Sequence, residues 1–364
     1  MIFEAWPRDG FKRNFVRGVF CGLLLVFAIT SYFGAWRVPD DNANTTKGKV
    51  KLEQNSSGWG QLRLEIPSTG RKKVFAFVGV QTGFTKDFNN PKYIYELRRE
   101  ALRKTWFPRS QAALDEFEEK TGVVVKFVMG HSIDESREWD VKVEEQKYGK
   151  FLRLDVEEGY LQLADKTLLF IRTVVKLYEP EYILKVDDDV YFRLDRVPHA
   201  VRQWKAKKSD YVGCMKRGEV FKDPRQRWHE PQHPLIGDSY YTHTWGTTYA
   251  MSRRAAEMIA GMPNGSLRFF NNEDTSFGVW MLALNVTHFD DRRLCSSHCT
   301  ESSIAVYDIP KCSGLCDPQT ELAQLHTMAD CQSPAVPDGL LDLPLEDEIM
   351  RVHGVVSRKS SLAP

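Results

Sequence analysis

The chain has 364 residues, of which 42% are hydrophobic and 27% are charged, and its formal net charge is +1. This composition is typical of a globular protein with an ample core, so it excludes a wholly disordered chain. The balanced charge gives no electrostatic reason to expect a nucleic-acid partner, and the length suits one large domain or two small ones.

The amino-terminal region contains an uncharged, strongly apolar segment over residues 18–36. At a rise of about 1.5 Å per residue, this segment can just span a hydrocarbon core about 30 Å thick. Basic residues concentrate before it, whereas Asp40 and Asp41 soon follow, which predicts a cytosolic tail over residues 1–17 and a lumenal remainder. A cleaved signal peptide is the alternative, but the apolar region is long and no clear cleavage site follows it. We therefore favour a transmembrane signal-anchor.

Residues 37–70 are rich in Asn, Ser, Thr, Gly and Lys and show little apolar periodicity, which predicts a flexible stem. Asn44 and Asn55 each begin an Asn-x-Ser/Thr sequence in this polar stretch, so both are candidate glycosylation sites. A folded lumenal domain is expected over residues 71–335, followed by a carboxy-terminal tail over 336–364.

Alternating strand and helix patterns follow in the folded domain. Apolar runs predict strands over 73–80, 123–129 and 182–186, and helical spacing predicts helices over 91–105 and 161–178, with a charged, exposed helix and loop over 132–150. This alternation predicts an α/β fold with a mostly parallel central sheet flanked by helices. Sheets of this class bind ligands at the carboxyl ends of their strands.

Three adjacent carboxylates, Asp187, Asp188 and Asp189, come directly after the strand predicted over 182–186. Adjacent acids repel one another, and a divalent cation with oxygen ligands is the usual compensation. A cation held by Asp187 and Asp189 would link the protein to a substrate phosphate, as in nucleotide-sugar transferases. A solvated acidic turn is the alternative interpretation of these three residues alone.

The cysteines predict an oxidising compartment. Cys21 lies in the apolar segment, and the other cysteines are candidates for disulfide bonds: Cys214, Cys295, Cys299, Cys312, Cys316 and Cys331. Zinc binding by the two Cys-x3-Cys pairs, with His298 and His326 nearby, is the alternative. The pairing of the cysteines stays open.

Four segments, in order, resemble glycosyltransferase family thirty-one, the β-1,3-galactosyltransferase and fringe-like group. They are residues 98–106 (R-R-E-A-L-R-K-T-W), 158–167 (E-G-Y-L-Q-L-A-D-K-T), the triple acid, and 272–278 (N-E-D-T-S-F-G). The chain departs from the family pattern at Gln162, where Asn is usual, and at Thr275, where Val is usual. Residues 290–295 (D-D-R-R-L-C) and 311–316 (K-C-S-G-L-C) look most like the plant-type branch.

The resemblance implies a GT-A fold, a UDP-sugar donor, Mn²⁺ (with Mg²⁺ as the substitute) and inversion at the anomeric carbon. It implies that Asp274 is the catalytic base, which takes a proton from the attacking hydroxyl. Without the resemblance, the alternative interpretation is that Asp274 caps the amino terminus of a helix beside Asn272.

The nucleotide-sugar contacts are expected from Asp188, Arg99, Arg103 and Lys166. Each basic residue also has a plain structural interpretation, because arginines and lysines on a helix commonly form surface ion pairs. A histidine often completes the metal site in this family, and His288, His298 and His326 are all open as that ligand.

These observations predict a hexosyltransferase of the Golgi membrane, with a lumenal catalytic domain, that transfers galactose from UDP-galactose to a glycan or glycoprotein hydroxyl in β-1,3 linkage. Alternatives within this class are a UDP-N-acetylglucosamine donor and a hydroxyproline acceptor. A non-catalytic carbohydrate-binding protein is the alternative from another class, but it predicts loss of the acids that are present. A metal-dependent phosphohydrolase is a third option, but it would normally need more metal-ligating clusters of His and Asp than the sequence contains.

Overall fold

A computed structural model describes residues 49–54, 60–65, 70–85 and 88–334. The tail, the signal-anchor, Asn44, Asn55 and the carboxy-terminal tail all lie outside these residues, so those predictions stay untested. No helix among the described residues is long and apolar enough to cross a membrane. Strands β1 (Lys49–Gln54) and β2 (Gly60–Glu65) pair antiparallel inside the segment predicted as a flexible stem. Apolar and polar residues alternate in both strands, and the prediction missed this period of two.

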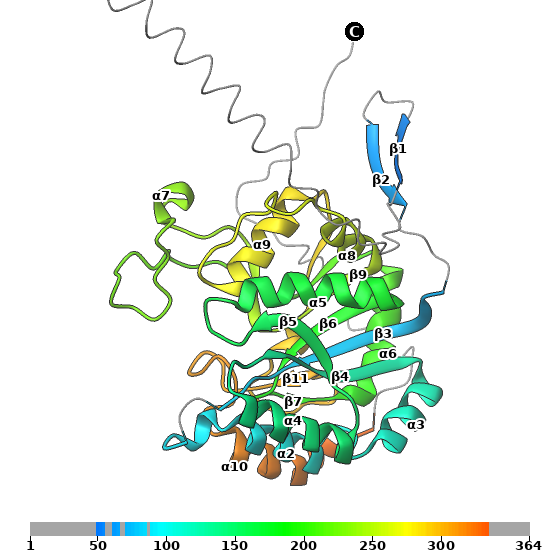
Figure 1. The fold of residues 1–364 in the computed structure, drawn as a ribbon, viewed down its shortest axis with the longest axis vertical. Coiled ribbons are helices and arrows are strands. Elements are labelled where there is room, and N and C mark those ends of the chain that lie inside the picture. Colours follow the sequence, from blue (N-terminus) through cyan, green and yellow to red (C-terminus); the bar gives the residue numbers. More distant parts are fainter. Residues whose placement is uncertain (1–48, 55–59, 66–69, 86–87, 335–364) are drawn as a thin grey trace, which may run out of the picture. The chain divides into compact units, whose positions relative to one another are not determined.

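The core of the fold is a mixed sheet of seven strands in the order β10-β8-β9-β6-β3-β4-β5 (Figure 1). Its strands are β3 (Lys72–Gln81), β4 (Val123–His131), β5 (Leu152–Glu157), β6 (Tyr178–Asp187), β8 (Tyr211–Lys216), β9 (His243–Ser252) and β10 (His288–Asp290). Strands β5, β4, β3 and β6 are parallel, and β9 runs antiparallel to both β6 and β8. The predicted mostly parallel α/β sheet is therefore confirmed, and the reversed β9 is the feature the prediction lacked.

Helices cover both faces of this sheet (Figure 1). The elements on one face are α2 (Tyr95–Lys104), α3 (Gln111–Thr121), α4 (Glu135–Tyr148), α6 (Val197–Ala206) and α10 (Pro318–Thr327). Those on the other face are α5 (Leu163–Leu177), α8 (Arg253–Ala260) and α9 (Glu273–Ala283). The short elements are α7 (His233–Ile236), α11 (Ala329–Gln332), β7 (Tyr191–Phe192) and β11 (Ala305–Val306). Burial of the central strands on both faces explains the continuous apolar runs over residues 74–80 of β3 and 182–184 of β6.

All six cysteines outside the apolar segment form disulfides in the structure. The pairs are Cys214–Cys295, Cys299–Cys331 and Cys312–Cys316. The disulfide prediction is confirmed, and the zinc alternative is wrong because every one of these thiols is bonded to another.

Candidate active site

The predicted site lies at one edge of the sheet, where several parallel strands end. Asp187 is the last residue of β6, and Lys216 is the last residue of β8. Residue His243 begins the antiparallel β9 and pairs with Lys216, so it lies at the same edge. The carboxyl ends of parallel strands are where open α/β sheets place their ligands, as the sequence predicted.

The triple acid is only partly neutralised, and its exposure differs along the run: Asp188 is buried, whereas the side chains of Asp189 and Asp187 are 15% and 33% exposed. Arg98 of α2 donates to Asp188 Oδ1 at 2.6 Å and lies 3.3 Å from Asp189 Oδ2. The second oxygen of Asp188 and Oδ1 of Asp189 are buried and have no hydrogen-bond partner within the described part of the chain. Burial, with the charge of Asp188, raises the pKa of Asp189 against the opposing effect of Arg98. These orphaned oxygens are acceptors that fit a hard cation.

Lys185 connects the triple acid to helix α9. Its ammonium lies 2.6 Å from Asp187 Oδ1 and 3.7 Å from Glu273 Oε2, and it also donates to the carbonyl of Gly246. Burial raises the pKa of Asp187 to about 7 despite Lys185, and the nearby charge of Asp189 adds to that rise. Burial alone would lower the pKa of Lys185, but Asp187 and Glu273 raise it, so the lysine is charged.

Asp274 lies in the first turn of α9, one residue after Glu273. Its Oδ2 is 2.8 Å from the ammonium of Lys216 and 3.8 Å from His243 Nε2, and its Oδ1 accepts from the backbone N–H of Thr275. Burial alone would raise its pKa, but the positive charge of Lys216 outweighs burial and holds the pKa of Asp274 below its ordinary value. Asp274 is therefore an ionised carboxylate at neutral pH, as a general base must be.

His243 is a neutral neighbour of this carboxylate. Its Nδ1 donates to the carbonyl of Tyr241 at 2.8 Å, so its Nε2 faces Asp274 without a proton. Burial lowers the pKa of His243 below its ordinary value, which keeps the ring uncharged. Neither His243 nor Lys216 was predicted, since both lie far from Asp274 in the sequence.

Arg99 and Arg103 do not face the triple acid. Both pair with Glu144 of α4: Arg99 Nη2 lies 2.7 Å from Oε2, and Arg103 Nη1 lies 2.6 Å from Oε1. Arg99 also donates to the carbonyl of Gly83 at 2.9 Å. These contacts favour a structural role, and the contact of both residues with the nucleotide stays a prediction. Arg98, which the sequence prediction passed over, is the arginine at the acids.

Lys166 is buried in α5 and forms an ion pair instead of facing open space. Its ammonium lies 2.6 Å from Glu158 Oε1 and donates to the carbonyl of Thr82 at 2.6 Å. It thereby fixes the loop after β3 against the end of β5. A diphosphate would have to compete with Glu158 for this lysine, so these contacts favour the structural interpretation.

A cavity of about 370 Å³ lies beside Glu158, at the carboxyl ends of β4 and β5. Its lining residues are Phe84, His131, Ser132, Ile133, Asp134, Arg137, Glu157 and Glu158. Apolar and hydrogen-bonding groups both line it, so it could hold a flat polar ring.

The three candidate histidines make other contacts. His288 Nδ1 lies 3.2 Å from the carbonyl of Val286, His298 Nδ1 is 3.2 Å from the hydroxyl of Ser297, and His326 Nδ1 is 3.2 Å from the hydroxyl of Tyr191. Among the residues that the structure describes, no three His, Cys, Asp or Glu side chains converge into a group that could hold a metal ion. The described side chains therefore offer carboxylates at the triple acid and no third protein ligand.

The triple acid at the end of β6 and Asp274 in the first turn of α9 form a cluster of carboxylates at this edge of the sheet, and comparison with known proteins gives the class of protein. The family model described as galactosyltransferase matches residues 97–292. The chain is 44% identical over 273 residues to "Probable beta-1,3-galactosyltransferase 12" of Arabidopsis thaliana, covering 75% of this chain and 71% of the relative. It is 41% identical over 268 residues to "Probable beta-1,3-galactosyltransferase 13" of the same plant, covering 73% and 76%.

The chain therefore belongs to the galactosyltransferase family, in its plant-type branch, and it is a hexosyltransferase. Both predictions are confirmed. Among solved structures, a fragment of S. aureus TarS with UDP-GlcNAc aligns at 18% identity with a TM-score of 0.33, covering 60% of this chain and 56% of that one. So low a score carries no argument about the donor.

Proposed function

We propose that this hexosyltransferase transfers galactose from UDP-galactose to a hydroxyl of a glycan or glycoprotein, in β-1,3 linkage and with inversion. The observation that carries the proposal is the Asp187–Lys185–Glu273 contact. It brings the triple acid and the carboxylate of Asp274 to one edge of the sheet. The names of the Arabidopsis relatives support the choice of galactose and of the linkage. A GT-A fold is the finer architecture that we infer from the family.

Asp274 would act as the base. The acceptor oxygen attacks the anomeric carbon, the bond from that carbon to the UDP oxygen breaks, and the hydroxyl proton moves to the carboxylate of Asp274. Lys216 fixes this carboxylate in the site, and the lowered pKa keeps it ready to accept a proton at neutral pH. A carboxylate has about four lone-pair positions, so the contacts to Lys216 and Thr275 leave room for the substrate hydroxyl.

Asp187 and Asp189 would hold Mn²⁺ or Mg²⁺. The buried, unpartnered Oδ1 of Asp189 fits such an ion, and the Asp187 carboxylate lies beside it and is partly open to solvent. When bound, the ion would neutralise the negative charge that develops on the UDP leaving group. Arg98 would keep Asp188 and Asp189 in place through the contacts described above. The cavity beside Glu158 would take the nucleoside part of the donor.

Residence in the Golgi lumen, behind the predicted signal-anchor, remains part of this proposal. Three disulfides support an oxidising compartment, because such bonds persist in the secretory pathway and are rare in the cytosol.

The test is release of UDP by the full chain in detergent, with UDP-galactose, UDP-N-acetylglucosamine or UDP-glucose and a panel of acceptors, each with Mn²⁺ or EDTA. We expect release only with UDP-galactose, Mn²⁺ and a suitable acceptor. Manganese-dependent release from UDP-N-acetylglucosamine alone would replace the proposed donor. Transfer to a hydroxyproline peptide would identify that acceptor class. Release that is insensitive to EDTA would overturn the metal assignment.

The variant Asp274→Asn tests the base. It keeps the size of the side chain and removes the carboxylate, so kcat should fall by about 10²–10⁴-fold while UDP binding is kept. Asp223→Asn is the matched control, because Asp223 pairs only locally with Arg225 in a surface loop. Normal turnover of a folded Asp274→Asn protein would mean that another residue is the base.

A further inference from the structure

A carboxy-terminal segment, residues 303–334, is fastened to the chain directly after the triple acid. Strand β11 pairs antiparallel with β7, so Val306 lies opposite Tyr191 and Ala305 opposite Phe192. This pairing begins two residues after Asp189. The segment lies beyond residues 97–292, which the family model matches.

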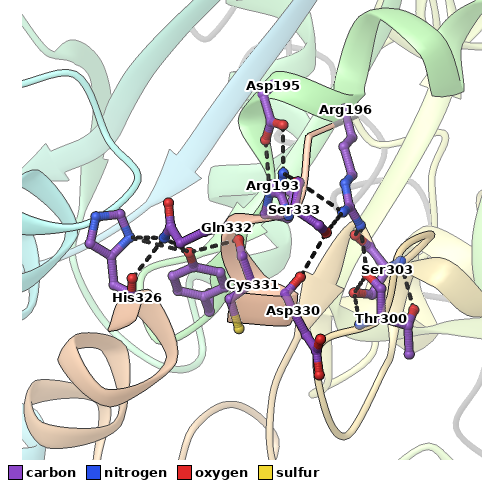
Figure 2. Close-up of polar contacts among 11 residues, drawn as sticks. Arg193, Asp195, Arg196, Thr300, Ser303, His326, Asp330, Cys331, Gln332 and Ser333 are labelled. Carbon is purple, nitrogen blue, oxygen red and sulfur yellow. Dashed lines mark hydrogen bonds and ion pairs between the residues drawn. The ribbon is translucent and has the colours of Figure 1, made fainter. Parts of the chain in front are cut away.

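The far end of the same segment is clamped to the same place. Figure 2 shows Arg193 and Arg196 directed at Ser333, and Arg193 Nη2 donates to the carbonyl of Ser333 at 2.5 Å. Arg196 Nη1 donates to the carbonyl of Ser303 at 2.7 Å. Near the far end, Cys331 is bonded to Cys299, which precedes the segment. Both ends of the segment are therefore attached to the residues that follow the triple acid.

Between them lie helix α10 and, before it, a small loop closed by the Cys312–Cys316 disulfide. Its backbone contacts the site directly: the N–H of Leu315 donates to the carbonyl of Asp189 at 2.7 Å, and the hydroxyl of Thr247 donates to the carbonyl of Ser313. The loop's own shape is fixed by Asp308, whose carboxylate accepts from the N–H of Cys316 at 2.7 Å.

Gly314 lies against the carboxylate of Asp189. A Cβ atom at this position would overlap Oδ1, Cγ and Oδ2 of Asp189, so only glycine allows this approach. Because Asp189 Oδ1 has no hydrogen-bond partner among the described residues, the packing of Gly314 helps to fix the direction of that carboxylate.

We propose that the disulfide-closed loop 312–316 forms a wall of the donor site, and that Gly314 is a positioning residue that orients Asp189 toward the cation and the donor diphosphate. This inference deepens the proposed function and rests on it. It assigns part of the site to a segment beyond the family match, through close backbone approach instead of a side-chain ligand.

The test is binding of Mn²⁺ in the presence of UDP, measured on the full chain in detergent by the electron paramagnetic resonance signal of free Mn²⁺. Gly314→Ala should weaken the apparent Mn²⁺ affinity by about tenfold or more, because the added methyl group displaces the Asp189 carboxylate. Gly218→Ala is the matched control, since a Cβ there meets nothing within 4 Å, and it should bind as the wild type does.

A second variant covers the case in which Gly314→Ala fails to fold. Cys312→Ser with Cys316→Ser opens the loop without adding an atom near Asp189, and it should also weaken Mn²⁺ binding. Wild-type affinity in either folded variant would overturn the positioning role and leave the proposed function intact. Absence of UDP-dependent Mn²⁺ binding in the wild-type protein would instead overturn the metal assignment, and with it this inference.

Discussion

Helix α2 contributes arginines to two buried clusters that differ in how completely their charges are paired. In the first cluster, Glu144 accepts from both Arg99 and Arg103, and each of its oxygens has a partner. In the second, Asp188 and Asp189 share the guanidinium of Arg98 and keep unpartnered oxygens. Both clusters are buried, so exposure does not explain the difference.

The comparison indicates how a structural ion pair is told from a binding site. Around Glu144 the charges are balanced, because Glu96 Oε1 also lies 3.8 Å from Arg99 Nη2. The rings of Tyr148 and Phe127 lie 4.2 and 4.9 Å from the Arg103 guanidinium and stabilise it further. The triple acid has an excess of negative charge, which is costly without a further cation. A saturated cluster has no capacity left for a ligand, whereas an unsaturated one does.

The largest expected effect is on stability, from Glu144→Gln. Removing this carboxylate charge leaves the buried Arg103 without its counter-ion and leaves Arg99 with only the more exposed Glu96, which should lower the free energy of unfolding by about 3–5 kcal/mol. The specific activity of the folded fraction should stay close to that of the wild type. Urea unfolding followed by fluorescence measures the first quantity, and UDP release per folded molecule measures the second.

Asp140→Asn is the control for Glu144→Gln, because Asp140 is an exposed acid on the same helix. If Glu144→Gln leaves the free energy of unfolding unchanged and abolishes activity, the contrast between the two clusters is wrong, since Glu144 would then belong to the active site.

The next effect is on activity, from Asp189→Asn. Loss of this charge should lower kcat/KM by about 10²–10³-fold. It also removes one of three mutually repelling carboxylates, so the free energy of unfolding should stay constant or rise. The two variants should therefore show opposite patterns. A destabilised Asp189→Asn protein with a normal response to Mn²⁺ would mean that Asp189, like Glu144, has a structural role and does not bind the ion.

The sequence predicted the strands and helices that carry this site better than the side-chain contacts within it. The apolar run before Asp187 and the helical spacing over 161–178 predicted a buried strand and helix, and both exist. Successive helix residues point about 100° apart, so sequence alone could not say which of Arg98 and Arg99 faces the acids. Lys185 did leave a signal, as a lysine inside a buried apolar strand requires a buried partner.

Other features depend on contacts between segments far apart in the sequence. Lys216 and His243 reach Asp274 only because β9 runs antiparallel beside β8, and nothing local in the sequence marks that reversal. The role of Gly314 depends on the segment held by β11 and the Cys299–Cys331 disulfide, whose pairing could not be deduced from the spacing of the cysteines.

The smallest expected effect tests whether Asp291, like Glu144, is a buried carboxylate whose charge is fully paired and which therefore has a structural role. This buried carboxylate accepts from Arg293 Nη2 at 2.6 Å and from Trp204 Nε1 at 2.7 Å. Burial alone would raise its pKa, but Arg293 and Trp204 lower the pKa of Asp291 below its ordinary value. Asp291→Asn should therefore lower the free energy of unfolding at pH 7 by about 1.5–3 kcal/mol, with activity retained.

The dependence on pH separates charge from packing at Asp291. A carboxylate with a lowered folded-state pKa stabilises the fold above its unfolded-state pKa, about 3.9, and this stabilisation is lost as the pH falls through the folded-state value. The difference in free energy of unfolding between wild type and Asp291→Asn should thus be constant from about pH 6 to about pH 8 and should shrink below about pH 4. A difference that persists unchanged into acid would mean that Asp291 acts through shape and not through its charge. Complete pairing of the buried charges would then not be what distinguishes the Glu144 cluster from the triple acid.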